Sequence, residues 1–434
     1  MKKRNAAGIK AAVVGMMMLN LTGCAQMLGN SNSVPKEQME SFASTVGSLA
    51  DIDAPDEARI IGFGEAAHGN KEFQRMKLDI FKDMVEDEGV RCFALEADMA
   101  GCKIAEKYTL YDQGTSEEAT RAIGFAIYRT DEIKALLEWI HDYNQGKDDS
   151  EKIRFRGFDS AFGENSVKCI KEFYATYVPD KAADFSANLD TYFCGEYGEC
   201  TDKSMYEDVK KLIADISKDL ASEKNTYVEK AGEEEYAMIE QITKGLDWYL
   251  DKTLTNTLSK GARDEYLFET VKWVLNREEA RDSKIFVSAH NGHMGKVNTI
   301  AGQKSNMGSL LKDEFGKEYY VIGSDYYESD CSFPGNNGRE NHKLCSDDPL
   351  SYQVQFLSTN ECYLDFAKVD AGSELGKMIS ENMTMGSLGE QYSAMMDMIP
   401  MYREVTAVPS EMYDSMIFVY DATPIEVWPY ADID

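Results

Sequence analysis

The chain has 434 residues and a formal net charge of −30, with 76 acidic residues against 46 basic ones. Such a charge repels phosphate polymers, so we expect no nucleic-acid partner. The length exceeds one typical domain of roughly 100–200 residues, which predicts a main domain with a substantial insertion.

The N-terminal segment has the parts of a signal peptide. Basic residues at 2–4 precede an apolar stretch at 11–19, which is too short to remain in a bilayer as a spanning helix. The sequence Leu-Thr-Gly-Cys at 21–24 resembles the lipobox of bacterial lipoproteins. We therefore expect residues 1–23 to be removed and Cys24 to carry a lipid that anchors the protein to the cell membrane. An ordinary secretory signal, the alternative, also predicts an extracytoplasmic protein.

Residues 24–40 contain Asn, Ser, Gly, Gln and Pro with little apolar periodicity, which is typical of a flexible tether. An α/β catalytic core is predicted to follow, over residues 41–166 and 281–434. Residues 167–280, between its two parts, show no convincing strand. They are charged and have long helical patterns, including one at 227–250, so we expect an all-helical insertion packed beside the sheet.

Short apolar runs predict the strands of the core. The first two, residues 58–63 and 91–95, flank a helical pattern at 71–88, which indicates a β-α-β unit with parallel strands. Further elements are a helix at 132–143 and strands at 153–158, 284–289, 319–324, 362–367 and 416–420. Together they predict an α/β fold with a mainly parallel sheet flanked by helices.

Nine cysteines, one of them in the lipobox, leave an even number that permits disulfides outside the cytoplasm. Cys194 and Cys200 flank a turn-forming spacing, and Cys331 and Cys345 enclose a loop rich in Gly, Asn and Pro. These two pairs are the disulfides we predict. Cys92 lies in an apolar strand and is expected to be a packed thiol.

Polar motifs follow four predicted strands, at the edge where an open parallel sheet binds ligands. The first reads Gly-Glu-Ala-Ala-His-Gly at 64–69. His68 would lie at the N-terminus of the next helix, where the helix dipole favours a neutral ring that can act as a base. A surface or capping histidine is the alternative.

The other three motifs place carboxylates and histidines at similar positions. Glu96 ends the second strand, where it could orient an imidazole, act on a water or cap a helix. Asp159 ends a third strand, and a structural role is favoured for it. His290 and His293 follow a fourth, so three of the five histidines lie in two strand-end motifs. We expect Glu65, His68, Glu96 and His290 to meet in one reactive centre.

These motifs resemble the erythromycin esterase family. The residues that carry the resemblance are 64–69, 72–73, 77, 93–97, 128–132, 143–144, 157–159, 263–264 and 289–293. The resemblance covers about residues 55–325, and we recognise no motif of the family after 326. In that family an α/β core with a helical insertion hydrolyses the lactone ester of macrolide antibiotics without a covalent serine intermediate.

The resemblance implies roles for individual residues. His68 would be the general base that activates water, and His290 would be the second catalytic histidine. Glu65 and Glu96 would belong to the same cleft and orient His68 or the water. The family's basic residue nine positions after the first histidine falls on Lys77. A lysine where an arginine occurs in the family loses a bidentate contact, so substrate binding is expected to differ.

The resemblance also implies substrate contacts for Asp159, Arg263 and His293. Ala67 departs from the family, which often has Thr there. The residues suit ester hydrolysis by themselves, because it needs a base, a group that holds the base and a donor for the oxyanion. The sequence has no Gly-x-Ser-x-Gly nucleophile elbow, which disfavours a serine triad. We expect no cofactor, and a bulky ester or lactone as substrate, with macrolide resistance as one implied role.

Two alternatives remain open. A metal-dependent hydrolase is one, because His68, His290, His293, Glu65 and Glu96 are all capable zinc or manganese ligands. A binding protein is the other, because the esterase core is similar to that of a family of haem-binding bacterial lipoproteins, and the 24 tyrosines could supply an axial ligand.

Overall fold

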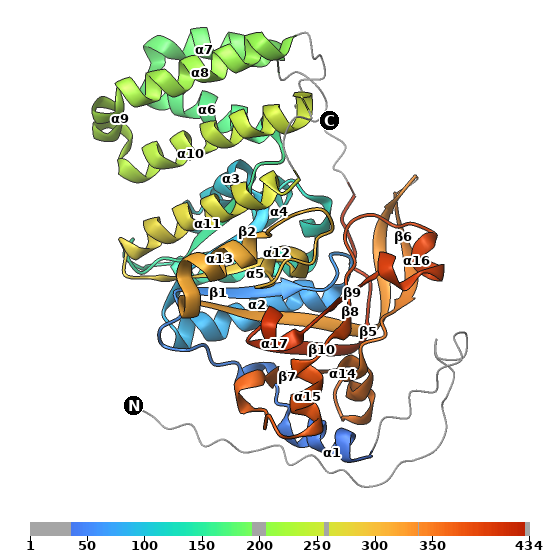
Figure 1. Cartoon of the computed structure of the whole chain (residues 1–434). Helices are drawn as coiled ribbons and strands as arrows, with labels where there is room; N and C mark the ends of the chain where they lie inside the picture. The colour runs from blue at the N-terminus through green and yellow to red at the C-terminus, as the bar shows by residue number, and fades with distance from the viewer. Residues whose placement is uncertain (1–35, 193–204, 256–259, 337, 430–434) are drawn as a thin grey trace. The chain divides into compact units, whose positions relative to one another are not determined.

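The computed structural model describes residues 36–192, 205–255, 260–336 and 338–429 (Figure 1). The chain forms two compact units. One, here called unit 1, comprises Met1–Asp53, Gly64–Phe73 and Val321–Ile425, and the other, unit 2, comprises Ala54–Phe63, Gln74–Tyr320 and Glu426–Asp434. The fold is α/β with mainly parallel strands flanked by helices, as predicted.

Unit 2 contains three complete parallel strands and the first part of a fourth. The strands are β1 (Ile60–Glu65), β2 (Val90–Asp98), β3 (Arg154–Asp159) and β4 (Lys284–His290), in the order β3-β2-β4-β1. β2 pairs in parallel with both β3 and β4. All four were predicted, since each is a buried apolar run, and each ends at or just beyond one of the polar motifs.

Helices cover both faces of these strands, and strand alternation sorts the side chains between them. On one face, Phe81 of α2 (Lys71–Asp87) lies 5.0 Å from Phe93 and 5.8 Å from Trp139 of α5 (Asp131–Asn144), between ring centroids. On the other face, α3 (Met99–Tyr111) and α11 (Ala262–Glu279) pack on β2 and β3.

The described elements between β3 and β4 are all helices. The helices before α11 are α6 (Gly163–Tyr177), α7 (Pro179–Tyr192), α8 (Tyr206–Ser222), α9 (Lys224–Ala231) and α10 (Glu233–Leu250), followed by a π-helical turn, η5 (Asp251–Thr255). They share an apolar core with the first turns of α3. The helix predicted over 227–250 is two helices, because Gly232 takes a φ of 88° that ends α9.

Unit 1 is built around the long strand β5. β5 (Tyr319–Gly335) pairs in parallel with β10 (Ser415–Ala422), and β10 pairs antiparallel with β7 (Glu361–Asp365). β5 continues well past the predicted 319–324 and forms a hairpin with β6 (Gly338–Cys345). The hairpin was missed because the side chains of β6 are mostly polar and exposed.

The remaining elements are short. Unit 1 also holds a small antiparallel pair, β8 (Met383–Gly386) and β9 (Glu404–Ala407). The remaining α-helices are α1 (Lys36–Thr45), α4 (Ser116–Ala122), α12 (Asn291–Met294), α13 (Met307–Phe315), α14 (Pro349–Gln353), α15 (Glu374–Ser380), α16 (Met395–Met398) and α17 (Pro409–Met412). Among the described helices, none has the length and apolarity to cross a membrane. The predicted signal peptide and Cys24 lie outside the described residues.

The predicted disulfide between Cys331 and Cys345 is wrong. Cys331 is a buried thiol, whereas Cys345 takes part in a disulfide. The β5–β6 register explains this, because Cys331 pairs with His342 and Cys345 pairs with Glu328, three positions along the ladder. Such a separation, roughly 10 Å, exceeds the reach of a disulfide. Cys92 is a buried thiol, as predicted, and the predicted pair at 194 and 200 lies outside the described residues.

Candidate active site

Glu65 and His68 form a hydrogen-bonded pair in unit 1. Glu65 ends β1 and is fully buried, and its Oε1 lies 2.6 Å from Nδ1 of His68, whose side chain is 13% exposed. An ionised carboxylate only accepts hydrogen bonds, so Nδ1 of His68 carries the proton and Nε2 carries the lone pair. This tautomer is the one that a general base requires.

The backbone around His68 is fixed by β5 and by the C-terminal part of the chain. Ser324 Oγ accepts from the amide of Ala66 at 3.0 Å and donates to the carbonyl of Gly64 at 2.8 Å. The His68 amide donates to the carbonyl of Leu388 at 3.2 Å, and the Leu388 amide donates to the carbonyl of Ala66 at 2.8 Å. Sequence reasoning missed Leu388, because an apolar residue in an aperiodic segment carries no chemical signal.

Gly69 allows the chain to pass close to β5 directly after His68. A Cβ at this position would lie 2.2 Å from the carbonyl oxygen of Ser332, a backbone atom that cannot move aside cheaply. We expect Gly69→Ala to lower the free energy of unfolding by about 1–3 kcal/mol, as overpacking does, and to reduce activity by displacing His68. Chemical denaturation and an ester hydrolysis assay measure the two effects.

The matched control for this prediction is Gly372→Ala, in the same unit. A Cβ there would approach only Asp370 Oδ1, at an ordinary contact distance of 3.4 Å, and Gly372 has no positive φ. Equal stability and activity of the two alanine variants would contradict the close approach at Gly69.

A second cluster, in unit 2, is centred on Arg263 at the start of α11. Its Nη2 donates to Glu96 Oε1 at 2.7 Å and to Asp159 Oδ2 at 2.8 Å, and its Nε also donates to Asp159 Oδ2, at 3.1 Å. Glu96 is 6% exposed and Asp159 is 1% exposed. Burial alone would lower the pKa of the guanidinium, but Asp159 and then Glu96 raise it above its ordinary value. Arg263 therefore places one positive charge between two strand-end carboxylates.

His293 completes this cluster and holds Arg263 in place. Its Nδ1 lies 2.7 Å from Asp264 Oδ1, and its Nε2 lies 2.9 Å from Nη1 of Arg263. A guanidinium can only donate, so Nε2 accepts and Nδ1 carries the proton. The 3.4 Å approach of Nε2 to Glu96 is then no ion pair. The lone pair of His293 is engaged, which makes this histidine a positioning residue and not a base.

His290 has the opposite proton arrangement to His68. Its backbone amide donates to Glu96 Oε2 at 2.9 Å, and its ring Nδ1 accepts from the amide of Gly292 at 3.1 Å, which caps α12. Because Nδ1 is an acceptor, the proton of the neutral ring is on Nε2. His290 is therefore arranged as a hydrogen-bond donor.

Two more residues of these motifs have clear surroundings. Asp98 caps α3 through the amide of Gly101 and accepts from the amides of Ala161 and Phe162, which ties the ends of β2 and β3 together. Burial raises its pKa to about 6. Lys77 is fully buried in α2, where its Nζ donates to Gln74 Oε1 at 3.0 Å.

Apart from Lys77, the predicted residues fall into two groups. Glu65 and His68 contact each other in unit 1, and Glu96, Asp159, Arg263, His290 and His293 form one connected cluster in unit 2. Within the part of the chain that the structure describes, no three His, Cys, Asp or Glu side chains are grouped so as to hold a metal ion.

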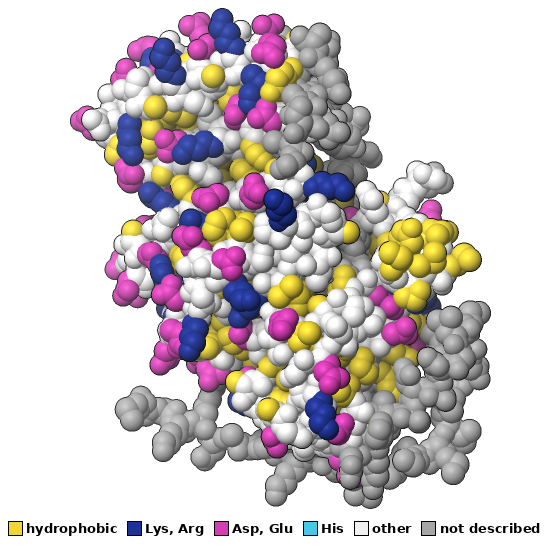
Figure 2. Space-filling model, viewed as in Figure 1, with side chains coloured by type: hydrophobic (Ala, Val, Ile, Leu, Met, Phe, Trp, Pro, Cys, Tyr) yellow, Lys and Arg dark blue, Asp and Glu magenta, His cyan; other side chains and the backbone are white. Residues whose placement is uncertain are grey.

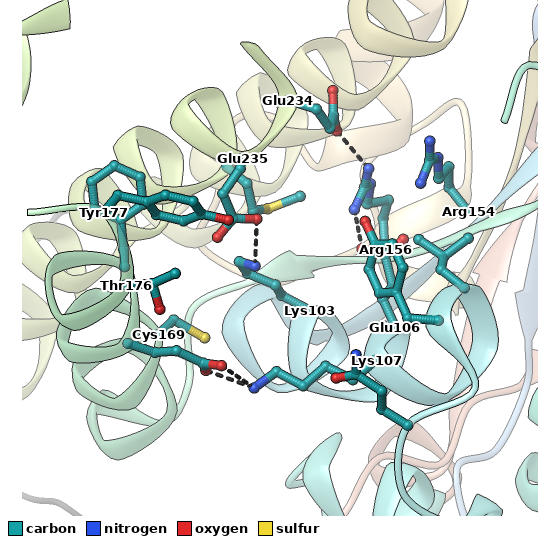
Figure 3. A pocket seen from close by; sticks show the side chains of 16 residues that line it. Lys103, Glu106, Lys107, Arg154, Arg156, Cys169, Thr176, Tyr177, Glu234 and Glu235 are labelled. Atoms are coloured by element: carbon teal, nitrogen blue, oxygen red, sulfur yellow. Dashed lines mark hydrogen bonds and ion pairs between the residues drawn. The ribbon is translucent and has the colours of Figure 1, made fainter. Parts of the chain in front are cut away.

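Unit 2 also has a cavity of about 370 Å³ that contains none of the predicted residues (Figure 3). It is lined by α3, β3, α6 and α10, and its cations already have partners. Lys103 pairs with Glu235 at 2.8 Å, and Arg156 pairs with Glu106 and, at 2.6 Å, with Glu234. These ion pairs join α3 and β3 to α10, so we assign them to packing.

Comparisons with known proteins point to one family. The family model described as erythromycin esterase matches residues 85–422. An erythromycin esterase type II of Escherichia coli is 26% identical over 298 residues, which are 62% of this chain and 70% of that protein. A putative hydrolase of Bacillus subtilis strain 168, YbfO, is 24% identical over 294 residues, 61% of this chain and 64% of that protein.

Solved structures share the fold. A Bacillus cereus protein has a TM-score of 0.72 at 21% identity and covers 90% of this chain and 98% of its own. A succinoglycan biosynthesis protein has a TM-score of 0.72 at 20% identity, covering 92% and 100%. An erythromycin esterase variant in its open conformation has a TM-score of 0.59 at 15% identity, covering 89% and 94%.

The matched span corrects the expected extent of the resemblance. It continues through β10 to residue 422, so the expectation that the resemblance ends near 325 is wrong. It begins at residue 85, after Glu65 and His68, whose assignment therefore rests on their own geometry.

Proposed function

The chain belongs to the erythromycin esterase family, and from this premise we propose that it is a hydrolase that cleaves an ester or lactone bond with a water molecule activated by His68. The observation that carries the proposal is the 2.6 Å contact between His68 Nδ1 and the buried carboxylate of Glu65. It sets the tautomer, orients the ring and supplies the charge that stabilises an imidazolium.

In the proposed reaction, Nε2 of His68 takes a proton from water as the water oxygen bonds to the carbonyl carbon. The tetrahedral intermediate then expels the alkoxide, which receives that proton from the imidazolium. The products are a carboxylic acid and an alcohol, and no covalent enzyme intermediate forms. His290, through Nε2–H, is proposed as the second catalytic histidine, a donor of the kind that stabilises an oxyanion.

Incubation of the purified protein with a panel tests the proposal. The panel contains p-nitrophenyl esters, simple lactones and erythromycin, and product masses identify the bond that is cleaved. For at least one ester or lactone, we expect the summed mass of the products to exceed the mass of the substrate by one water, 18 Da. A panel that stays intact would refute the hydrolase. The substrate is proposed to be bulky, with macrolides, environmental esters and lactone signals as candidates.

The metal-dependent and haem-binding alternatives are not favoured. The comparisons name hydrolases and esterases, and the described residues contain no metal-binding group of three. Activity that survives dialysis against a chelator is the expected result.

The extracytoplasmic location is a further part of the proposal and is supported by the lipobox-like sequence at 21–24. Wild-type protein is expected in the membrane fraction and Cys24→Ser in the soluble fraction. Equal distribution of the two proteins between the fractions would contradict the proposed lipid anchor.

A further inference from the structure

A loop in unit 1 is closed at its base and fixed in place. β8 and β9 pair from Met383 with Ala407 to Gly386 with Glu404, and residues 387–403 connect them. We call this connection the methionine loop. The Ser387 amide donates to the carbonyl of Arg403 at 2.8 Å, which closes the base. The Arg403 side chain is 5% exposed, and its Nε donates to the carbonyl of Cys345 at 2.8 Å.

The methionine loop exposes a set of large apolar side chains. The exposed fractions are 40% for Met395, 78% for Met398, 78% for Met401 and 49% for Tyr402. Figure 2 shows a hydrophobic cluster over α16, the helix that contains Met395 and Met398. Large apolar side chains gathered in this way on a surface mark a binding site more often than scattered ones do.

The acidic side chains of the loop already have hydrogen-bond partners. Glu390 accepts from both terminal nitrogens of Arg339, at 2.8 and 3.0 Å, and Asp397 accepts from Tyr392 Oη at 2.6 Å. The large exposed apolar side chains of the loop are three thioethers and one phenol. Unbranched methionine side chains adapt to apolar ligands of varied shape.

The base of the methionine loop is bonded directly to the backbone of the proposed general base. Leu388, its second residue, accepts from the amide of His68 at 3.2 Å and donates to the carbonyl of Ala66 at 2.8 Å. Just before the loop, the Gly386 amide donates to Asp325 on β5 at 2.9 Å. The apolar surface and the His68 segment are thus parts of one hydrogen-bonded structure within unit 1.

We propose that the methionine loop binds the apolar part of the ester whose hydrolysis His68 catalyses. The inference rests on the proposed function and adds to it the residues that select the substrate, Met398 and Met401 foremost. An ester with an extended apolar acyl chain gains contact with the loop, whereas an acetyl ester is too short to do so. The loop therefore sets the preference for chain length and leaves the chemical step unchanged.

The test compares p-nitrophenyl octanoate with p-nitrophenyl acetate as substrates of the full chain. In a Met398→Gln, Met401→Gln double variant, glutamine keeps nearly the volume of methionine and removes its apolarity. We expect kcat/KM for the octanoate to fall roughly tenfold, through KM, and kcat/KM for the acetate to stay within about twofold. The matched control is Phe356→Gln, in the same unit, where the side chain is 50% exposed. It is expected to change neither value.

Other results overturn the inference. A double variant with the same octanoate-to-acetate ratio of kcat/KM as wild type would refute the binding role of the loop. If the double variant has an unchanged ratio and also loses dimers in sedimentation or loses binding to phosphatidylcholine vesicles, the surface serves a second copy or a membrane, and the inference is refuted. If wild type cleaves neither ester, the proposed function fails for these substrates. The affinity of the protein for octanoate, measured by calorimetry, then tests the binding role of the loop separately. Equal affinity of wild type and double variant would then refute it.

Discussion

His68→Ala is expected to lower kcat/KM for ester hydrolysis by about 10²–10⁴-fold, the range that a positioned general base contributes. The alanine removes Nε2, the nitrogen that takes the proton from water, while Glu65 remains buried beside the site. Steady-state kinetics on a p-nitrophenyl ester measures the loss, and circular dichroism checks that the fold is kept.

The matched control for His68→Ala is His141→Ala. His141 also bonds to a carboxylate, Asp112, at 2.9 Å, and stacks on Tyr108 with 4.4 Å between ring centroids. It lies in α5, away from the strand-end motifs, so its loss is expected to leave kcat/KM within about twofold of wild type. Two variants with the same kcat/KM would contradict the role of His68. The kcat/KM of Glu65→Gln is expected to lie between those of His68→Ala and His141→Ala. The amide oxygen of glutamine still accepts a hydrogen bond from the His68 ring but does not stabilise the charge of the imidazolium.

Arg263→Met is expected to lower the free energy of unfolding by about 1–3 kcal/mol, because the carboxylates of Glu96 and Asp159 are buried whereas the Arg263 side chain is 31% exposed and partly screened by water. The substitution leaves Glu96 and Asp159 buried without their common cation. Methionine keeps much of the side-chain volume, so the loss reports charge more than packing. Urea denaturation measures the difference.

Arg75→Met is the control for this prediction, because Arg75 pairs with Asp79 on the surface of α2, with both side chains about two-fifths exposed. Exposed pairs contribute about 0–1 kcal/mol, so a small change is expected. A loss at Arg263 no larger than the loss at Arg75 would show that the cluster around Arg263 does not stabilise unit 2.

The strand-end positions of the candidate residues were predictable where polar residues interrupt apolar runs. Three buried strands end at Glu65, Asp159 and His290, and Glu96 lies two residues before the end of β2. The end of a strand can be predicted from hydrophobic periodicity alone. Their proton arrangements were not readable. The tautomers of His68, His290 and His293 depend on hydrogen bonds to partners that only the folded chain supplies.

The C-terminal part was the least predictable. β6 is polar, and its pairing with β5 depends on register and not on composition. The contact of Leu388 with His68 joins residues 320 positions apart through main-chain groups, which any side chain would permit. The break at Gly232 was readable in principle, because glycine adopts the positive φ that ends a helix.

The central claim is that water, activated by the Glu65–His68 pair, attacks the ester directly. Its most direct test is a single turnover of wild type in H₂¹⁸O, with mass spectrometry of the acid product and of the rapidly quenched intact protein. The claim predicts one ¹⁸O in the acid and an unmodified protein mass at every time point. A protein mass increased by the acyl group during turnover would contradict it.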